Sequence, residues 1–184
     1  MRPFQLKDYS VWKAAYTNTF PKQNEFDLEK KSPNESSLKV FKNFVKLNSR
    51  YIKQEQIFQF GIFEKQTGRL MGYLLLALIV RFNVQSARIS YVILNNYWKH
   101  GYGREAVEGL VRFAFHKLKL HRLEVEIEPH NRASIALIKA VGFQPEGIRR
   151  GAVYFDRKWH DHVVYAILAE DRGIKNFRPS IFRK

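Results

Sequence analysis

The residues best placed to do chemistry form a glycine-spaced turn that joins two segments of different periodicity. The turn reads Trp98-Lys99-His100-Gly101-Tyr102-Gly103-Arg104. The segment before it, Ala87–Leu94, is rich in β-compatible residues and is expected to be a strand. After the turn, apolar residues recur at the spacing of one helical face, which predicts a helix that runs to about Leu118. The turn therefore opens a helix.

The chemistry that such a turn can do is to hold a phosphate group. Gly101 and Gly103 have no Cβ, so the backbone can approach a ligand closely. The first amides of a helix have no partner within the helix and lie at the positive end of its dipole, where an anion fits. Lys99, His100 and Arg104 add positive charge or donors at this end. We interpret the turn as a pyrophosphate seat.

Three carboxylates form a second candidate group. Glu124, Glu126 and Glu128 alternate along the predicted strand Arg122–Glu128, on the face opposite its apolar residues. A carboxylate on that face could act as a general base. The alternative is a solvated face whose glutamates pair with the many Lys and Arg side chains, and it stays open for all three.

A predicted helix follows this strand and carries two further candidates. Asn131 is placed to cap its N-terminus, and Gly142 suits the position after its last residue, Val141. Ser134 is the third residue of the helix. Either residue could have no more than a structural role, as a cap or as a first-turn hydroxyl in solvent.

Composition narrows the classes of protein to which the chain can belong. A length of 184 residues with 45% hydrophobic and 15% aromatic content suits one domain, so we expect a single domain over 1–184 with a core over 57–171. The sequence has no cysteine, which excludes disulfides, thiolate metal sites and a cysteine nucleophile. The histidines are not spaced as a ligand set, so we predict no metal site. No targeting or membrane-spanning segment is evident, and we expect a cytoplasmic protein.

The charge balance is strongly basic, with 32 Lys and Arg against 17 Asp and Glu and a formal net charge of +15. A positive surface attracts polyanions, so the ribosome, a nucleic acid or an acidic protein could be a partner, although many basic proteins have none. The basic residues are scattered, which argues against specific DNA binding. Residues 172–184 form a basic tail that is expected to be docked or frayed.

The remaining patterns predict two N-terminal helices and a run of strands. The first helix is expected to be capped by Asp8, and the second to start at Ser36 or Ser37 and end before Gln56. Two strands, over 57–64 and 70–82, flank a hairpin turn, and two more, over 149–155 and 159–168, form a closing hairpin. Tyr154, Trp159 and Tyr165 are expected to pack in the core or the hairpin. The order predicts an α+β fold with a mixed sheet.

Several segments, taken in order, resemble the GNAT acetyltransferase superfamily and its Rim-type branch of ribosomal-protein N-terminal acetyltransferases. They are Arg88–Leu94, Trp98–Arg104, His121–Ser134 and Ala140–Gly147, with Trp159-His160-Asp161 near the end. The glycine turn alone would be weak evidence, but the Asn-x-x-Ser helix and its Gly-Phe ending follow at family-like distances. The resemblance implies the GNAT fold, with a sheet splayed at the cofactor site and helices on both faces.

The resemblance also implies acetyl-CoA as the acetyl donor. The backbone amides from Lys99 to Arg104 would hold its pyrophosphate, and its pantetheine would lie along the strand ending at Ile93 and Leu94, beside Asn131. Glu126 would be the base for the acceptor amine. Ser134 would stand in for the tyrosine acid of many relatives, because that tyrosine's position is occupied here by Ile138.

The acceptor class is the main open question at this stage. The resemblance favours a protein N-terminal α-amine, and the basic surface favours a ribosomal or acidic-protein acceptor over a polyamine. Small amines such as an amino acid, a polyamine or an aminoglycoside remain alternatives. A non-catalytic protein that binds CoA or associates with the ribosome also remains possible, because Ile138 cannot donate a proton.

Overall fold

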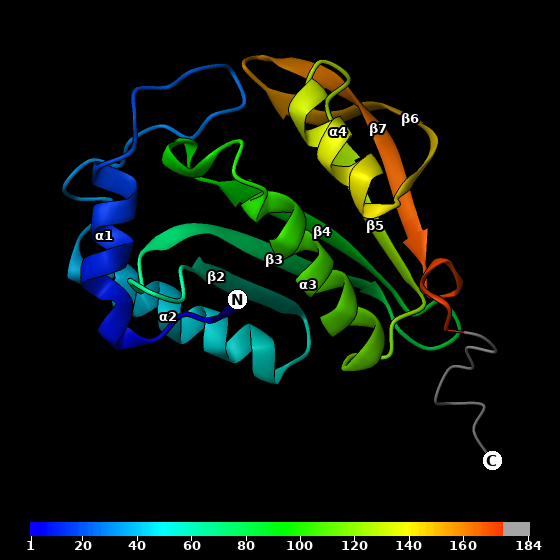
Figure 1. Cartoon of the computed structure of the whole chain (residues 1–184), viewed down its shortest axis with the longest axis horizontal. Coiled ribbons are helices and arrows are strands. Elements are labelled where there is room, and N and C mark those ends of the chain that lie inside the picture. Colours follow the sequence, from blue (N-terminus) through cyan, green and yellow to red (C-terminus); the bar gives the residue numbers. More distant parts are fainter. Residues whose placement is uncertain (175–184) are drawn as a thin grey trace. The chain divides into compact units, whose positions relative to one another are not determined.

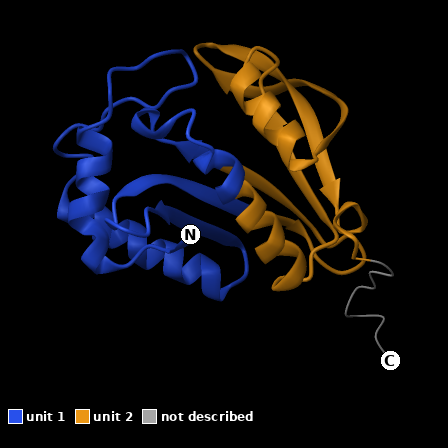
Figure 2. Ribbon diagram, viewed as in Figure 1, with its two compact units in different colours: residues 1–77, 91–106 blue, residues 78–90, 107–184 orange. Residues whose placement is uncertain are grey.

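The computed structural model describes residues 1–174. These residues form two compact units, shown in different colours in Figure 2. The N-terminal unit comprises residues 1–77 and 91–106, and the C-terminal unit begins with residues 78–90 and continues from residue 107. Most of the predicted basic tail, residues 175–184, lies outside the described residues.

The N-terminal unit contains the helices α1 and α2, the strand β2 and most of β3, which are labelled in Figure 1, together with shorter elements. Its elements are β1 (Arg2–Pro3), η1 (Leu6–Asp8), α1 (Tyr9–Thr17), α2 (Leu38–Lys53), β2 (Ile57–Phe63), most of β3 (Leu70–Val80), the last residues of β4 (Ser86–Ile93), η2 (Asn95–Tyr97) and the first turn of α3 (Tyr102–His116). Both predicted helices and the β2–β3 hairpin are confirmed within a few residues.

An aromatic cluster holds α1 and α2 in the N-terminal unit. Its buried members are Phe4, Trp12, Tyr16, Phe41 and Leu70. The rings of Trp12 and Phe41 have centroids 4.9 Å apart, which joins the buried face of α1 to that of α2. Asn48 of α2 is also buried, and its side-chain amide donates to the carbonyl of Gln59 in β2 at 3.0 Å. The inward face of α2 is therefore fixed by packing and by a buried hydrogen bond.

The strands of the N-terminal unit follow the order β1-β2-β3-β4. The β1 and β2 strands pair antiparallel, with Arg2 opposite Gly61, so a short first strand is present that the sequence analysis did not predict. The β2 and β3 strands are also antiparallel, with Phe60 opposite Leu74. This pairing confirms the predicted hairpin, whose turn has Gly68 at φ 72°.

The C-terminal unit contains the first part of β4, the rest of α3 and four further elements that the sequence predicted. These are β5 (Arg122–Ile127), α4 (Arg132–Val141), β6 (Gln144–Phe155) and β7 (Lys158–Leu168), followed by the 3-10 turn η3 (Glu170–Arg172). The strand order is β4-β5-β7-β6, parallel between β4 and β5 and antiparallel elsewhere. The predicted α+β fold with a mixed sheet is therefore confirmed.

The parallel pairing between β4 and β5 is short. It comprises three residue pairs, from Ser86 opposite Arg122 to Arg88 opposite Glu124. β5 continues beyond Glu124 in register with β7, up to Ile127 opposite Val163. The last residues of β5 thus depend on the antiparallel partner β7 for their place in the sheet.

Two local expectations were wrong. Asp8 does not cap α1 with its side chain; its carboxylate instead accepts from the Gln5 amide and from both terminal nitrogens of Arg2. β6 begins at Gln144, five residues earlier than predicted. Tyr154 and Trp159 pack against each other across the hairpin with most of their surface exposed, which confirms the expected hairpin packing for these two residues.

Candidate cofactor site

The predicted phosphate seat is a tight turn between η2 and α3, and two of its residues have left-handed backbone conformations. Lys99 has φ 64° and Gly101 has φ 81°. A lysine in this region is uncommon and costs about 1 kcal/mol or more, so the surrounding structure must hold the turn in place. Glycine adopts the same conformation without that cost. Gly101 is needed here for its backbone conformation, because a Cβ built on it would meet only open space.

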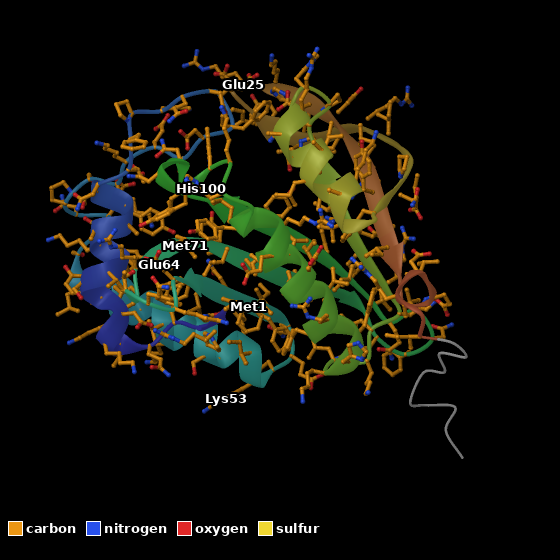
Figure 3. The ribbon with its side chains drawn as sticks, viewed as in Figure 1. Met1, Glu25, Lys53, Glu64, Met71 and His100 are labelled. Atoms are coloured by element: carbon orange, nitrogen blue, oxygen red, sulfur yellow. The ribbon has the colours of Figure 1, made fainter. Side chains whose placement is uncertain are left out.

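The first turn of α3 offers amides for an anion. The amide of Glu105 donates to the carbonyl of Gly101 at 3.1 Å, which is the first bond of this helix. By helix geometry, the amides of Tyr102 and Gly103 precede that bond and have no partner within the helix. His100, labelled in Figure 3, is exposed and stacks on Tyr102 with a centroid distance of 5.8 Å. Lys99 and Arg104 are also exposed, so the three basic side chains lie at the surface of the turn.

The end of β4 is tied directly to this turn. The indole nitrogen of Trp98 donates to the carbonyl of Ile93 at 2.7 Å, so the turn folds back on the strand end. The amide of Leu94 donates to Met71 of β3 at 2.9 Å, and its carbonyl accepts from Tyr97 at 2.8 Å. The Leu94 amide and the carbonyls of Ile93 and Leu94 are therefore already used within the protein, and each carbonyl keeps a second lone pair that could accept from a cofactor arm.

Gly72 of β3 sets how closely β3 approaches the end of β4, and the sequence analysis did not single it out. A Cβ at this position would overlap the carbonyl oxygen of Val92 and lie 3.1 Å from the Cα of Ile93. Both neighbours are backbone atoms and cannot rotate away as a side chain could. The position of the strand end therefore depends on the absence of a side chain at residue 72.

Asn95 is the second residue that sequence reasoning missed. Its side chain is 5% exposed; the oxygen accepts from the amide of Phe20 at 2.9 Å, and the nitrogen donates to the carbonyl of Phe20 and to Asp27. The neighbouring Asn96 also accepts from Phe20, at 3.1 Å. The two asparagines thus anchor the long connection between α1 and α2 beside the strand end. The Asn-Asn pair just after a predicted strand was the available signal.

A small hollow lies at this end of β4 within the N-terminal unit. Its volume is about 240 Å³, and residues of α1 line it together with Leu70, Leu94 and Tyr97. The hollow borders the same strand end that the turn and the asparagines hold. It is a candidate space for part of a ligand at this strand end.

In the C-terminal unit the predicted cap of α4 is confirmed. The side-chain oxygen of Asn131 accepts from the backbone amide of Ser134 at 3.1 Å, and Gly142 ends the helix with φ 99°. Ser134 is half-buried in the first turn of the helix. Ile138, at the position of the tyrosine acid in many relatives, is 0% exposed and belongs to the core. Asn131 and Ser134 are thus connected by a hydrogen bond, whereas Ile138 is buried and cannot contact a ligand at the surface.

Glu126 lies between two arginines. Its side chain is 9% exposed, and it pairs with Arg88 at 2.7 Å and with Arg149, whose side chain is 52% exposed. Both guanidinium groups bind the same carboxylate oxygen, Oε1. Of the two, the more exposed Arg149 is the easier to displace.

The other two glutamates of this face are also paired. Arg122 binds both Glu124, at 2.9 Å, and Glu146 of β6. The hydrogen bond from Arg122 is the main reason why the pKa of Glu146 lies below its usual value. Glu128 lies 3.2 Å from Nδ1 of His160, whose other ring nitrogen faces the carbonyl of Phe155 at 3.1 Å. Glu124 and Glu126 share the polar face of β5 as predicted, whereas Glu128 follows the end of the strand, and each of the three has a basic partner.

Within residues 1–174, no group of three or more acidic or histidine side chains is arranged to hold a metal ion. In the same part of the chain, no helix combines the length and the apolar character that crossing a bilayer requires.

Comparison with known families decides the classification. Residues 1–144 match the family model described as the acetyltransferase (GNAT) domain, which is more than half of the chain. The chain belongs to the GNAT acetyltransferase family. The matched range contains the whole turn and the first turn of α4.

Relatives of this GNAT chain include two bacterial proteins named as N-acetyltransferases. It is 38% identical over 120 residues to the probable N-acetyltransferase YjcK of Bacillus subtilis, covering 65% of this chain and 66% of that protein. It is 27% identical over 123 residues to the [ribosomal protein uS5]-alanine N-acetyltransferase of Escherichia coli, covering 67% and 63%. The matches thus span slightly less than two thirds of these relatives' lengths.

Solved structures with the same fold cover most of the chain. The ribosomal-protein-S5-alanine acetyltransferase of Vibrio fischeri superposes with a TM-score of 0.78 at 19% identity, over 97% of this chain and 94% of that one. Mycobacterium smegmatis RimJ in complex with CoA-disulfide superposes with a TM-score of 0.77 at 22% identity, over 92% and 81%. At these identities the structures show that the GNAT fold is shared.

Proposed function

We propose that this protein transfers the acetyl group of acetyl-CoA to a primary amine, with a protein N-terminal α-amine as the acceptor. The observation that carries the proposal is the turn at residues 98–101, which is held in a costly conformation and places the first amides of α3 at an exposed, basic surface. Membership of the GNAT family supports the same cofactor. Bound acetyl-CoA would supply the acetyl thioester.

The residues around the turn have distinct roles in this proposal. The amides of Tyr102 and Gly103 bind the diphosphate together with the side chains of Lys99 and Arg104. The backbone of Ile93 pairs with the pantetheine arm at the end of β4, where Trp98 and Gly72 hold the strand in place. In the C-terminal unit, Asn131 fixes the first turn of α4, and Ser134 donates a hydrogen bond to the departing thiolate.

Glu126 acts as the base in this proposal once one of its arginine partners has left. The acceptor arrives as an ammonium ion, because an α-amine titrates near pH 8. We propose that the ammonium replaces the half-exposed Arg149 beside the Glu126 carboxylate, while Arg88 stays in place. The carboxylate then takes one proton, and the neutral amine attacks the thioester carbonyl. The C–S bond breaks, and the second proton of the attacking nitrogen passes to the departing thiolate, which gives the acetylated amine and CoA thiol.

Two variants separate a base from a purely structural ion pair. Glu126→Gln is expected to lower kcat by about 100-fold. Arg149→Gln is expected to lower the KM for the acceptor, because the ammonium no longer competes with a guanidinium. If Glu126 were only structural, Arg149→Gln would leave the KM unchanged and Glu126→Gln would lower the melting temperature without a matching loss of kcat.

The acceptor class rests on charge and on relatives. A net charge of +15 disfavours the approach of a polycationic amine, whereas a protein N-terminus carries a single charge. The uS5-alanine acetyltransferase of E. coli is named for a ribosomal-protein acceptor. Both observations favour a protein acceptor over a polyamine such as spermidine.

Because the sequence has no cysteine, the release of CoA thiol can be measured without a background from the protein. A thiol reagent added to the reaction detects only released CoA, because the protein has no thiol of its own. We expect release with a peptide that has a free N-terminal alanine, and none with the same peptide acetylated at its N-terminus but carrying a lysine. Release with spermidine alone would refute the acceptor class, and CoA binding without release for any amine would refute the enzymatic proposal.

A further inference from the structure

One face of α2 carries all the charged residues of that helix, and all of them are basic. These residues, which we call the basic face, are Lys39, Lys42, Lys46, Arg50 and Lys53. At 100° per residue they fall within an arc of about 80°, and they extend over about 21 Å along the helix axis. All five are exposed, and Lys53 is labelled at the end of the helix in Figure 3.

The orientation of this face is fixed by the residues on the other side of the helix. Phe41 is fully buried in the aromatic cluster, and Asn48 is bonded to the carbonyl of Gln59. Asn48 lies roughly opposite the basic residues on the helical wheel. The basic face therefore points away from the protein core.

The clustering of like charges on the basic face lowers the stability of α2 when no partner is bound. Like charges three or four residues apart on a helix repel each other, and α2 contains no acidic residue that could offset them. In the described residues 1–174, no carboxylate forms an ion pair with any side chain of the basic face. The basic face also borders an open hollow of about 840 Å³, lined by Leu6 and Ser49 as well as four of its own residues. A polyanion would relieve this repulsion.

We propose that the basic face of α2 is a docking surface for the phosphate backbone of RNA. The cations follow one another at intervals of about one helical turn, so they complement a partner whose negative charges repeat along a strand. Four of the five residues are lysines, which are depleted in protein–protein interfaces but common at phosphates. Ser49 and Gln54 add neutral donors of the kind that bind phosphate oxygens.

The choice of RNA among phosphate polymers rests on the proposed function, because an enzyme that acetylates ribosomal proteins would meet its acceptor beside ribosomal RNA. The charged surface itself is an observation that does not depend on the proposed function. The surface lies wholly in the N-terminal unit, and none of its residues belongs to the turn, the strand end or the ion pairs of Glu126. Docking through α2 would hold the enzyme near its acceptor without taking part in acetyl transfer.

The test measures RNA binding by the full chain. Fluorescence anisotropy of a labelled RNA hairpin is followed over KCl concentrations from about 50 to about 200 mM. The test variant replaces four cations, as Lys42→Gln, Lys46→Gln, Arg50→Gln and Lys53→Gln. A matched control removes the same charge at dispersed exposed sites, as Lys13→Gln, Lys65→Gln, Lys117→Gln and Lys139→Gln.

The α2 variant is expected to bind RNA at least 100-fold more weakly near 0.1 M salt, and its log–log salt slope should fall by about 3 to 4. The dispersed control should lose less than about fivefold, as expected for net charge alone. Equal losses in the two variants would overturn the proposal, and so would retention of binding by the α2 variant. Tighter α2-dependent binding to poly-glutamate of equal charge would assign the surface to an acidic protein instead.

Two readouts keep this test separate from folding and from the proposed function. The α2 variant should melt no lower than the wild type, because glutamine favours helices and the repulsion is removed. Acetylation of a free peptide should be unchanged in the α2 variant. RNA binding that depends on α2 in a protein that acetylates no peptide would uphold the docking surface and refute only the enzymatic proposal.

Discussion

Gly72→Ala is the change that most directly links the packing of the sheet to the cofactor site. The added methyl group would overlap the carbonyl oxygen of Val92 by about 1 Å relative to ordinary contact, so β3 and β4 must separate by a similar distance. Overpacking of this kind costs about 1–3 kcal/mol. For a chain of this length the melting temperature should fall by about 2–12 °C.

The same displacement should weaken cofactor binding. Because Ile93 follows Val92 directly, moving the strand end shifts the backbone that we propose for the pantetheine arm, and we expect the Kd for CoA to rise at least tenfold, about 1.4 kcal/mol. Circular dichroism gives the melting temperature and calorimetry gives the Kd. Gly68→Ala is the matched control: it strains the hairpin turn at φ 72° but meets no atom, so it should lower stability without changing the Kd. An unchanged Kd in Gly72→Ala would refute the reasoning.

Three further changes test other parts of the account. Asn95→Ala removes the hydrogen bonds that hold the α1–α2 connection, so trypsin should cleave that connection faster, whereas equal cleavage rates would contradict the anchoring role. Burial raises the pKa of Asp8, but the hydrogen bonds from Arg2 and Gln5 outweigh burial and hold the pKa below its usual value. The Arg2–Asp8 pair therefore stabilises the fold above about pH 4, and this stabilisation is lost as the pH falls. Asp8→Asn should therefore melt about 4–8 °C lower at pH 7, and a gap that persisted at pH 2 would contradict this. Ser134→Ala should lower kcat and leave the Kd for CoA unchanged, and an unchanged kcat would return the serine to a structural role.

Local signals predicted most of the secondary structure. The Asn-x-x-Ser start and the glycine end of α4 specify both helix caps within ten residues, and the structure confirms them. The alternation along β5 correctly placed Glu124 and Glu126 on one face and Leu123 in the core. These features depend on neighbours in the sequence, which is why they could be read from it.

Long-range partners could not be read in the same way. The pairing of Glu126 with Arg88 and Arg149 joins residues from three strands, and no local pattern indicates it. The roles of Gly72 and Asn95 likewise depend on backbone that arrives from a distant part of the chain. Asp8 was a plausible helix cap by type, but Arg2 and the Gln5 amide compete successfully for its carboxylate.

We expect the turn before α3 to bind the diphosphate of CoA. Amide NMR of the full chain tests it by comparing CoA with pantetheine, which has no diphosphate. We predict that CoA shifts the amide resonances of Tyr102 and Gly103 more than those of α2, and that pantetheine leaves both unchanged. Saturable CoA binding that leaves Tyr102 and Gly103 unshifted, or equal shifts with pantetheine, would contradict the account.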